Sequence, residues 1–242
     1  FEFYKVGTKN DKIIMTKLVE DIFVTKLIGF KSYIIHKKIL ARTLNNIKKP
    51  FFLTIKSKKK IVLIPALKNI NITLASKLIY FERNFKKKYQ ILVKCRRAKK
   101  QDINQIVKIA SENNLNSRFL KDKLIPRKFK KKYRSEWIKN FFKKKRGDYL
   151  IVADLNKKIL GFILIIKNKN HLNIDLIASS KKYRKKGVAT SLINYINNKI
   201  MKKKDKIFAG TQIDNYIAIK MYKKLGFIKK KKVTFCYHIH GR

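Results

Sequence analysis

Residues 176–193 read Leu-Ile-Ala-Ser-Ser-Lys-Lys-Tyr-Arg-Lys-Lys-Gly-Val-Ala-Thr-Ser-Leu-Ile, and this stretch decides the fold prediction. An apolar run at 172–178 has the length and composition of a buried strand, and it leads into a polar loop at 179–187. Beyond that loop, apolar residues at Val188, Leu192 and Ile193 have the spacing of a helix face. The stretch therefore predicts a strand, a turn and a helix in direct succession.

The turn before this helix is suited to bind an anion. Unpaired N–H groups and the helix dipole both favour a phosphate oxygen at a helix N-terminus, and Gly187 lets the backbone approach that oxygen closely. Ala189 keeps the first helical turn clear, while Arg184, Lys185 and Lys186 add positive charge. In a chain this rich in lysine, an ordinary strand-to-helix turn explains the same residues equally well.

The rest of the C-terminal part alternates helices and strands. The patterns predict helices at 102–110 and 129–142, a hairpin of 149–153 with 159–166, a strand at 207–211, a helix at 215–225 and a last strand at 233–239. Asp102 can cap the first of these helices. An aromatic stripe at Phe129, Tyr133, Trp137 and Phe141 is expected to form core rather than to bind a cofactor.

Short apolar runs separated by lysine clusters fill the first 90 residues or so. Their β-branched and aromatic residues suit strands, which we expect at 33–35, 51–55, 61–64 and 78–81. A further strand is expected at 91–93, after the basic stretch 85–89. We therefore place a domain boundary near residue 90, with a small α/β domain at 1–90 and a larger domain at 91–242.

The charge is extreme, because 63 Lys and Arg against 14 Asp and Glu give a formal net charge of +49. A dedicated nucleic-acid binder would gather its basic residues on one face and use arginine for base contacts, whereas lysine is spread throughout this chain. We interpret the excess of lysine, isoleucine and asparagine as an A+T-rich coding bias. Weak, non-specific binding to polyanions is the expected side effect.

Other sequence features bear on the cellular location, the metal content and the oligomeric state. The chain has no apolar run of about 18 residues and no signal-peptide pattern, so we expect no membrane insertion and a cytoplasmic location. Cys95 and Cys236 lack the paired spacing of a zinc site, which predicts two reduced thiols and no metal. The oligomeric state stays open, with a homodimer as one candidate.

Two signatures in the right order resemble the GNAT acetyltransferase superfamily. The stretch from Tyr183 to Ile193 is similar to its acyl-CoA signature, Arg/Gln-x-x-Gly-x-Gly/Ala after a splayed strand. The stretch from Asn215 to Phe227 is similar to its second signature, an Asn, an Ala and a Tyr-x-x-x-Gly-Phe ending. The resemblance implies an α/β acyl-CoA N-acyltransferase fold, a mixed central sheet with flanking helices, and acetyl-CoA as cosubstrate.

The resemblance also implies roles for individual residues. The strand would contact the pantetheine arm and the thioester carbonyl, the turn would hold the pyrophosphate, and the amide of Asn215 would orient the cofactor. The implied cofactor-binding residues are Leu176, Ile177, Ala178, Arg184, Lys185, Lys186, Gly187, Val188, Ala189, Thr190 and Asn215. Tyr222 would protonate the leaving thiolate, with a packed helix tyrosine as the alternative. The general base stays open among His171, Asp175, His238, His240 and water.

Further segments narrow the resemblance to two-domain GNAT enzymes that acetylate nucleotide-linked amino sugars, such as dTDP-4-amino-4,6-dideoxygalactose. These segments are 78–83, 117–119, 133–138, 209–212 and 234–238. The first domain would be a degenerate GNAT-like unit, although the glycines usual there are sparse. Arg118 and Arg134 are candidate cations for the nucleotide phosphates, with a plain surface location as an equal alternative.

Two rival functions stay open. A protein N-terminal acetyltransferase of the ribosomal-protein type would use the same turn and the same tyrosine, although such enzymes are usually single domains. A non-enzymatic, basic RNA-binding protein with a vestigial fold would instead bind RNA with strong salt dependence and would not bind acetyl-CoA.

Overall fold

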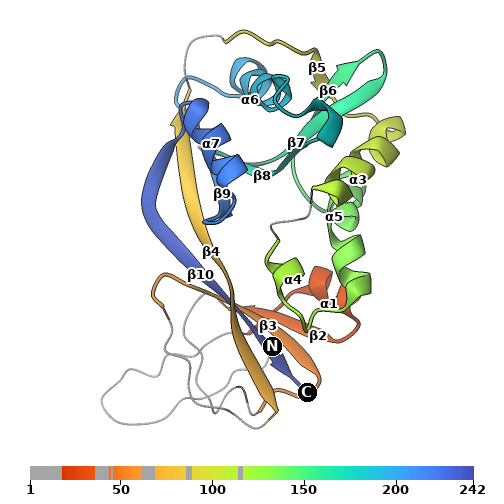
Figure 1. The fold of residues 1–242 in the computed structure, drawn as a ribbon, viewed down its shortest axis with the longest axis vertical. Coiled ribbons are helices and arrows are strands. Elements are labelled where there is room, and N and C mark those ends of the chain that lie inside the picture. The colour runs from red at the N-terminus through yellow and green to blue at the C-terminus, as the bar shows by residue number, and fades with distance from the viewer. Residues whose placement is uncertain are drawn as a thin grey trace. The chain divides into compact units, whose positions relative to one another are not determined.

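The computed structural model describes residues 18–35, 44, 46–60, 69–85, 89–113, 117–169 and 171–242 (Figure 1). The strand expected at 61–64 lies outside these residues. By their contacts, the residues form two compact units. Unit 1 comprises 1–78, 118–130 and 232–242, and unit 2 comprises 79–117 and 131–231. The division is therefore discontinuous in sequence, unlike the single boundary that we place near residue 90.

Unit 1 is a small α/β unit. Its strands lie in the order β1 (Val19–Glu20), β2 (Lys31–Ile35), β3 (Phe51–Ser57) and β10 (Ile228–Gly241), of which the unit holds the C-terminal part. β2 runs parallel to β3, and β10 runs antiparallel to β3 from Phe235 opposite Ser57 to Gly241 opposite Phe51. Helix α1 (Ile22–Ile28) begins at Asp21, whose carboxylate accepts the N–H of Val24.

The two faces of β10 in unit 1 pack differently, because alternate side chains of a strand point to opposite sides. Tyr237 and Ile239 join an apolar cluster with Phe51, Leu53 and Ile55. On the other face, His238 and His240 meet a group of aromatic rings. Those rings are Phe52 of β3, Phe119 of α4 (Arg118–Lys121) and, against Phe119, Phe129 of α5 (Arg127–Phe142).

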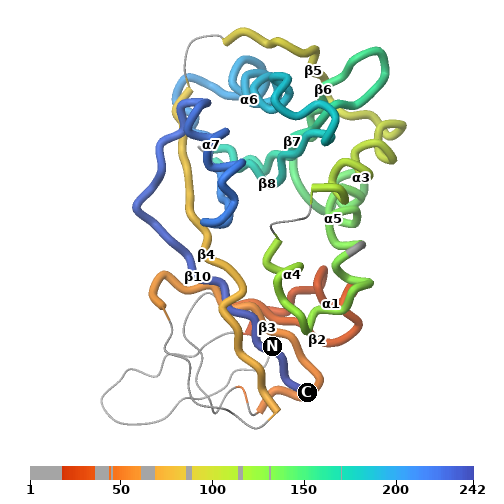
Figure 2. Tube along the Cα trace, viewed as in Figure 1, coloured from red at the N-terminus to blue at the C-terminus, as the bar shows by residue number. Residues whose placement is uncertain are grey.

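Unit 2 holds most of the strands that the structure describes. Its strands lie in the order β10, β4 (Ile70–Asn84), β9 (Lys206–Gln212), β8 (His171–Ser179), β7 (Lys158–Asn168), β6 (Tyr149–Leu155) and β5 (Cys95–Arg97). β6, β7 and β8 form the expected antiparallel meander, and β9 is parallel to β8. Helix α6 (Val188–Lys199) connects β8 to β9, and α7 (Tyr216–Lys224) connects β9 to β10; Figure 2 follows this path along the chain.

Helices cover the meander because each has one apolar face. Ile106, Ile109 and Ala110 of α3 (Ile103–Glu112) and Ile138 of α5 form one buried cluster with side chains of β6, β7 and β8. Phe129 and Tyr133 are buried, and Trp137 and Phe141 are partly buried, so the aromatic stripe is core as predicted. Of the helices that the structure describes, none is both long and apolar enough to cross a bilayer.

Two local predictions are wrong. Residues 91–93 do not form a strand, because the N–H groups of Leu92 and Val93 donate to the hydroxyl of Ser191 on α6, at 3.1 and 3.0 Å. The strand begins at Cys95 instead. Asp102 precedes helix α3 but does not cap it, because its carboxylate accepts the N–H of Lys99 at 2.7 Å and pairs with Arg96 at 2.7 Å.

Gly161 of β7 brings the end of β8 and the start of α6 close together. It pairs with Ser179, the last residue of β8. A Cβ at this position would lie 2.6 Å from Cγ1 of Val188 and 2.7 Å from the carbonyl oxygen of Ala178. No side chain fits in that space, so this glycine fixes the position of the turn between β8 and α6.

We predict that Gly161→Ala lowers the free energy of unfolding by about 1–3 kcal/mol, because the added methyl group meets backbone that cannot move aside. Gly210→Ala is the control, since its Cβ would lie 3.4 Å from the ring of Tyr80, which is an ordinary contact. Urea denaturation followed by circular dichroism measures both. Equal stability of the two variants would contradict the steric role of Gly161.

Candidate functional site

The turn before α6 presents free backbone donors. After a 3-10 turn at Lys181–Tyr183, the backbone takes positive φ at Lys185 (61°) and at Gly187 (74°), and α6 begins at Val188. Gly187 is the N-cap and no side chain caps the helix. The first helical hydrogen bond runs from the N–H of Ser191 to the carbonyl of Gly187, at 2.9 Å. The N–H groups of the first helical turn therefore precede that bond, in the arrangement that favours an anion.

Glycine is favoured at position 187, mainly by the backbone conformation. Its φ lies in the left-handed region, which costs other residues about 1–2 kcal/mol. A Cβ there would also lie 2.9 Å from Cδ1 of Leu92, in the segment that runs along α6. Leu92 is a part of the site that the sequence does not reveal, because its contact with the turn spans nearly a hundred residues.

Asn113 holds the turn from the other side. This residue ends α3, and its amide N–H group donates to the carbonyls of Ile109 at 2.8 Å and Ser179 at 3.0 Å. Its amide oxygen accepts from the guanidinium of Arg184 at 2.8 Å. Asn113 therefore joins the end of β8 to the first cation of the turn. Lys185 and Lys186, the other two cations, are exposed to solvent.

β8 separates from β9 next to this turn. The two strands pair only from His171 opposite Lys206 to Ile174 opposite Ala209. Leu176, Ile177 and Ala178 continue β8 alongside β7, with no pairing to β9. Among the described residues, their edge on the β9 side therefore has no strand partner.

Asn215 and Tyr222 lie on α7, in the same unit. Asn215 is the N-cap: its amide oxygen accepts the N–H of Ala218 at 3.3 Å, and its amide nitrogen donates to the hydroxyl of Thr211 at 3.0 Å. Capping already engages this amide, so its effect on a cofactor would be to hold the start of α7 in place. Tyr222 is 3% exposed and lies between Phe81 and Phe227, with ring centroids 5.5 and 5.2 Å away.

Burial sets the protonation of the two groups that could do acid or nucleophilic chemistry. It raises the pKa of the Tyr222 phenol well above its ordinary value near 10, so this residue keeps its proton at neutral pH. Burial also raises the pKa of the Cys95 thiol to about 12, which leaves very little thiolate. Both cysteines are free, as predicted.

The carboxylate of Asp175 is engaged in hydrogen bonds and is not a free base. It is the extra residue of a β-bulge, because Leu164 pairs with Leu176 while Ile165 pairs with Ile174. Its oxygens accept two hydrogen bonds from the guanidinium of Arg146, both at 2.7 Å, and one from the indole N–H of Trp137 at 2.8 Å. With both oxygens engaged, Asp175 orients these side chains.

The candidate substrate cations lie in different units. Arg134 belongs to unit 2, and its guanidinium lies over the ring of Trp137 at 5.1 Å, while that of Arg146 lies at 4.1 Å. Arg118 belongs to unit 1, where its guanidinium lies 4.5 Å from the ring centroid of Phe119. The structure thus stacks both predicted cations on aromatic rings, and it places Arg134 and Arg146 on the ring of Trp137.

A family comparison decides what this arrangement is. Residues 105–227, about half of the chain, match the model of the acetyltransferase (GNAT) family. The chain belongs to the acetyltransferase (GNAT) family. The matched residues contain both signatures, including the turn before α6, Asn215 and Tyr222.

Relatives of this GNAT chain include a protein named for polysaccharide biosynthesis and an N-alpha-acetyltransferase. The spore coat polysaccharide biosynthesis protein SpsD of Bacillus subtilis is 27% identical over 139 residues, which are 57% of this chain and 47% of SpsD. The chain thus spans about half the length of SpsD. An N-alpha-acetyltransferase of Saccharolobus solfataricus is 29% identical in an alignment 163 residues long, which covers 60% of this chain and 86% of that protein.

The fold agrees with the family. The solved structure of a GNAT-family protein from Novosphingobium aromaticivorans has a TM-score of 0.52 and 10% sequence identity, over 81% of this chain and 76% of that one. At that identity the likeness concerns the fold alone. The mixed sheet with flanking helices that the sequence predicts is therefore confirmed.

We predict that Asp175→Asn lowers the free energy of unfolding by about 1–3 kcal/mol, because the guanidinium of Arg146 loses its charged partner. Trp137 is the single tryptophan, so its emission reports on this contact and should shift as the indole is released. Asp148→Asn is the control, because Asp148 accepts one backbone N–H, that of Lys167, at 2.7 Å. A control that changes Trp137 emission as much as Asp175→Asn does would refute this role.

Proposed function

We propose that this protein is an N-acetyltransferase that transfers an acetyl group from acetyl-CoA to the amino group of a nucleotide-linked amino sugar. The observation that carries the acetyl-CoA half of the proposal is the uncapped N-terminus of α6 behind Gly187, in a chain of the GNAT family. The choice of a sugar amine rests on further observations given below.

The residues present suit acetyl-CoA. The free N–H groups of the first turn of α6 would bind the pyrophosphate, and the exposed side chains of Lys185 and Lys186 would add charge. The unpaired edge of Leu176–Ala178 would bind the pantetheine amides as a further strand would. The group supplies an activated acetyl thioester when it is bound.

The chemistry needs an acid rather than a protein nucleophile. A neutral amine attacks the thioester carbonyl, the carbon–sulfur bond breaks, and the sulfur leaves as a thiolate that must gain a proton. Tyr222 is proposed to supply it, since its phenol is fully protonated at neutral pH. If the thiolate forms in the same buried environment, the pKa of its thiol is raised as well. The proton can then pass to the sulfur even from the weakly acidic phenol of Tyr222.

The proton lost by the amine is proposed to leave through water. Asp175 is occupied by Arg146 and Trp137, and its role is to orient these two side chains. His171 is half-buried at the start of β8, with its ring edge-on to Phe208 at 5.2 Å. Neither residue has the free, oriented contact that a general base needs.

The acceptor is proposed from the aromatic and cationic group around Trp137. Guanidinium groups suit the phosphate oxygens of a nucleotide-linked sugar. The Nε of Arg134 is buried and has no hydrogen-bond partner among the described residues, so it retains a donor for an anionic ligand. The match to SpsD, named for polysaccharide biosynthesis, supports a sugar-linked amine.

The second candidate acceptor is the N-terminal amine of a protein. It is favoured by the N-alpha-acetyltransferase of S. solfataricus, of which the match covers 86%. Initial rates with dTDP-linked amino sugars and with peptides of varied N-termini, at equal acetyl-CoA, distinguish the two. Turnover with peptides and none with any sugar nucleotide would replace the first candidate by the second.

We predict that Gly187→Ala weakens acetyl-CoA binding about tenfold or more, because alanine resists the positive φ and its methyl group meets Leu92. Isothermal titration calorimetry measures the affinity, with Gly210→Ala as the control that should bind like the wild type. The enzymatic proposal fails if the wild-type protein is folded, does not bind acetyl-CoA, and binds RNA with an affinity that falls steeply as the salt concentration rises.

We predict that Tyr222→Phe lowers kcat by about 10²–10⁴-fold and leaves the affinity for acetyl-CoA unchanged, since only the acid is lost. Because the pKa of this phenol is raised, its deprotonation should not reduce the wild-type kcat below about pH 10. Single-turnover rates measured from pH 6 to 10 test both statements. Full activity of Tyr222→Phe would assign the acid to another group.

A further inference from the structure

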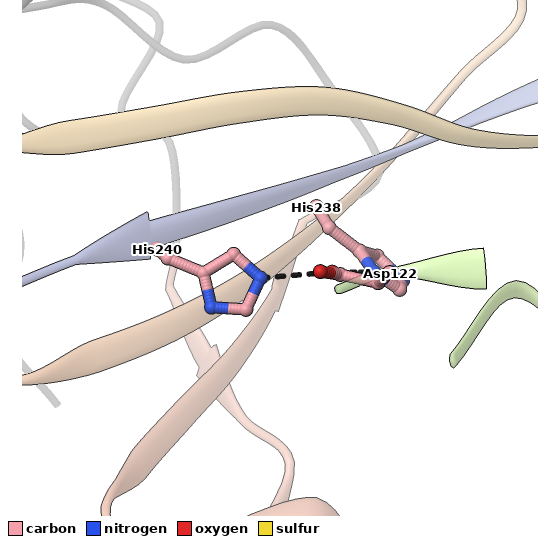
Figure 3. A group of neighbouring side chains, drawn as sticks. All are labelled: Asp122, His238 and His240. Carbon is pink, nitrogen blue, oxygen red and sulfur yellow. Dashed lines mark hydrogen bonds and ion pairs between the residues drawn. The ribbon is translucent and has the colours of Figure 1, made fainter. Parts of the chain in front are cut away.

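Two histidines and an aspartate meet in the interior of unit 1; Asp122 lies within residues 105–227, which match the family model, and both histidines lie beyond them. His238 and His240 lie on the same face of β10, and Asp122 follows α4 (Figure 3). Oδ2 of Asp122 lies 2.6 Å from Nδ1 of His238 and 2.8 Å from Nε2 of His240. One oxygen therefore faces two imidazole nitrogens at once.

All three side chains are withdrawn from solvent. The exposed fractions are 2% for Asp122, 0% for His238 and 5% for His240. Rings of Phe52 and Phe119 surround the histidines: Phe119 stacks on His238 at 5.4 Å, and Phe52 lies 4.9 Å from His238 and 5.0 Å from His240. The cluster is thus a polar group in an apolar shell.

The convergence of donor atoms is what suggests a ligand. Oδ2 of Asp122 faces one nitrogen of each imidazole inside an apolar shell, so three possible ligand atoms share one buried place. A carboxylate withdrawn from water is stabilised by a cation.

We propose that Asp122, His238 and His240 form a structural site for a divalent transition metal, with zinc as the best fit. The three donor atoms lie within 4.8 Å of one another. Two imidazole nitrogens and one carboxylate oxygen are a donor set that zinc accepts readily, whereas calcium and magnesium prefer oxygen alone. This proposal goes beyond the proposed acetyl transfer and does not depend on it.

Metal binding requires the three donors to rearrange: the two imidazole nitrogens, within 4.8 Å of each other, would approach one another, and the carboxylate oxygen would move outward. Ligand bonds of about 2.0–2.2 Å in a tetrahedron place neighbouring donors about 3.3 Å apart. The oxygen of Asp122 would therefore move away from each nitrogen by roughly half an ångström, which rotation of the carboxylate allows. Oδ1 of Asp122 already accepts the N–H of Leu124 at 2.9 Å, so a water would complete the four ligands.

The protons can also rearrange within the cluster. Each nitrogen that faces the carboxylate must offer its lone pair to the metal, so its hydrogen moves to the other ring nitrogen. On His238 that nitrogen is Nε2, which is buried and has no hydrogen-bond partner among the described residues. No protein contact at Nε2 therefore fixes the tautomer that would exclude a metal.

Metal content of the full-length protein, purified without a histidine tag and treated with a chelator, tests the proposal. After equilibrium dialysis against zinc, the wild type should hold about one ion per chain by mass spectrometry. Asp122→Asn and His240→Gln should each weaken zinc binding more than about tenfold. His171→Gln is the matched control outside the cluster and should bind like the wild type.

A second measurement covers the case in which a cluster variant folds poorly. Zinc should raise the Tm of the wild type and of His171→Gln, a chelator should reverse this, and His240→Gln should not respond. Cobalt bound to the wild type should give the visible absorption of a tetrahedral site, and the same metal added to His240→Gln should not. No binding by the wild type, or equal binding by wild type and His240→Gln, would show a metal-free hydrogen-bonded cluster and overturn the proposal.

Discussion

The missing side chain at Gly161 is the constraint on which the rest of unit 2 depends. It allows β7 to lie directly under the junction of β8 and α6, where any larger residue would meet Val188 and the carbonyl of Ala178. The turn between these two elements is then fixed at one end by the pairing of Ser179 with Gly161, and at the other end by the backbone conformation of Gly187. Asn113 adds a third attachment.

Main-chain groups form most of the proposed cofactor site. The donors at the start of α6 and the unpaired edge of β8 exist because of backbone geometry, which two glycines and a break in strand pairing impose. A site of this kind tolerates a biased surface composition, because lysine can occupy many positions without touching it. This explains how a chain with a net charge of +49 retains a recognisable cofactor turn.

Local patterns predicted the parts of the fold that local physics decides. The meander, the β8–α6–β9 order and the buried aromatic stripe follow from periodicity and from one well-placed glycine. Contacts between distant residues were not predictable in this way. The hydroxyl of Ser191 accepts the N–H of Leu92, so residues 91–93 do not join the sheet. Arg96 pairs with Asp102, which was expected to cap a helix. Asp122 contacts His238, more than a hundred residues further along the chain. The cysteine spacing that argued against a metal could not reveal such a cluster.

The discontinuous sequence of unit 1 has a consequence for how the protein is made. β3 pairs with β2 on one side and with β10 on the other, and β10 follows the residues of unit 2 in the sequence. Until β10 has been synthesised, β3 has an open edge on that side. Unit 1 therefore completes its fold only after unit 2 has been translated, and an excised N-terminal fragment would expose an aggregation-prone strand.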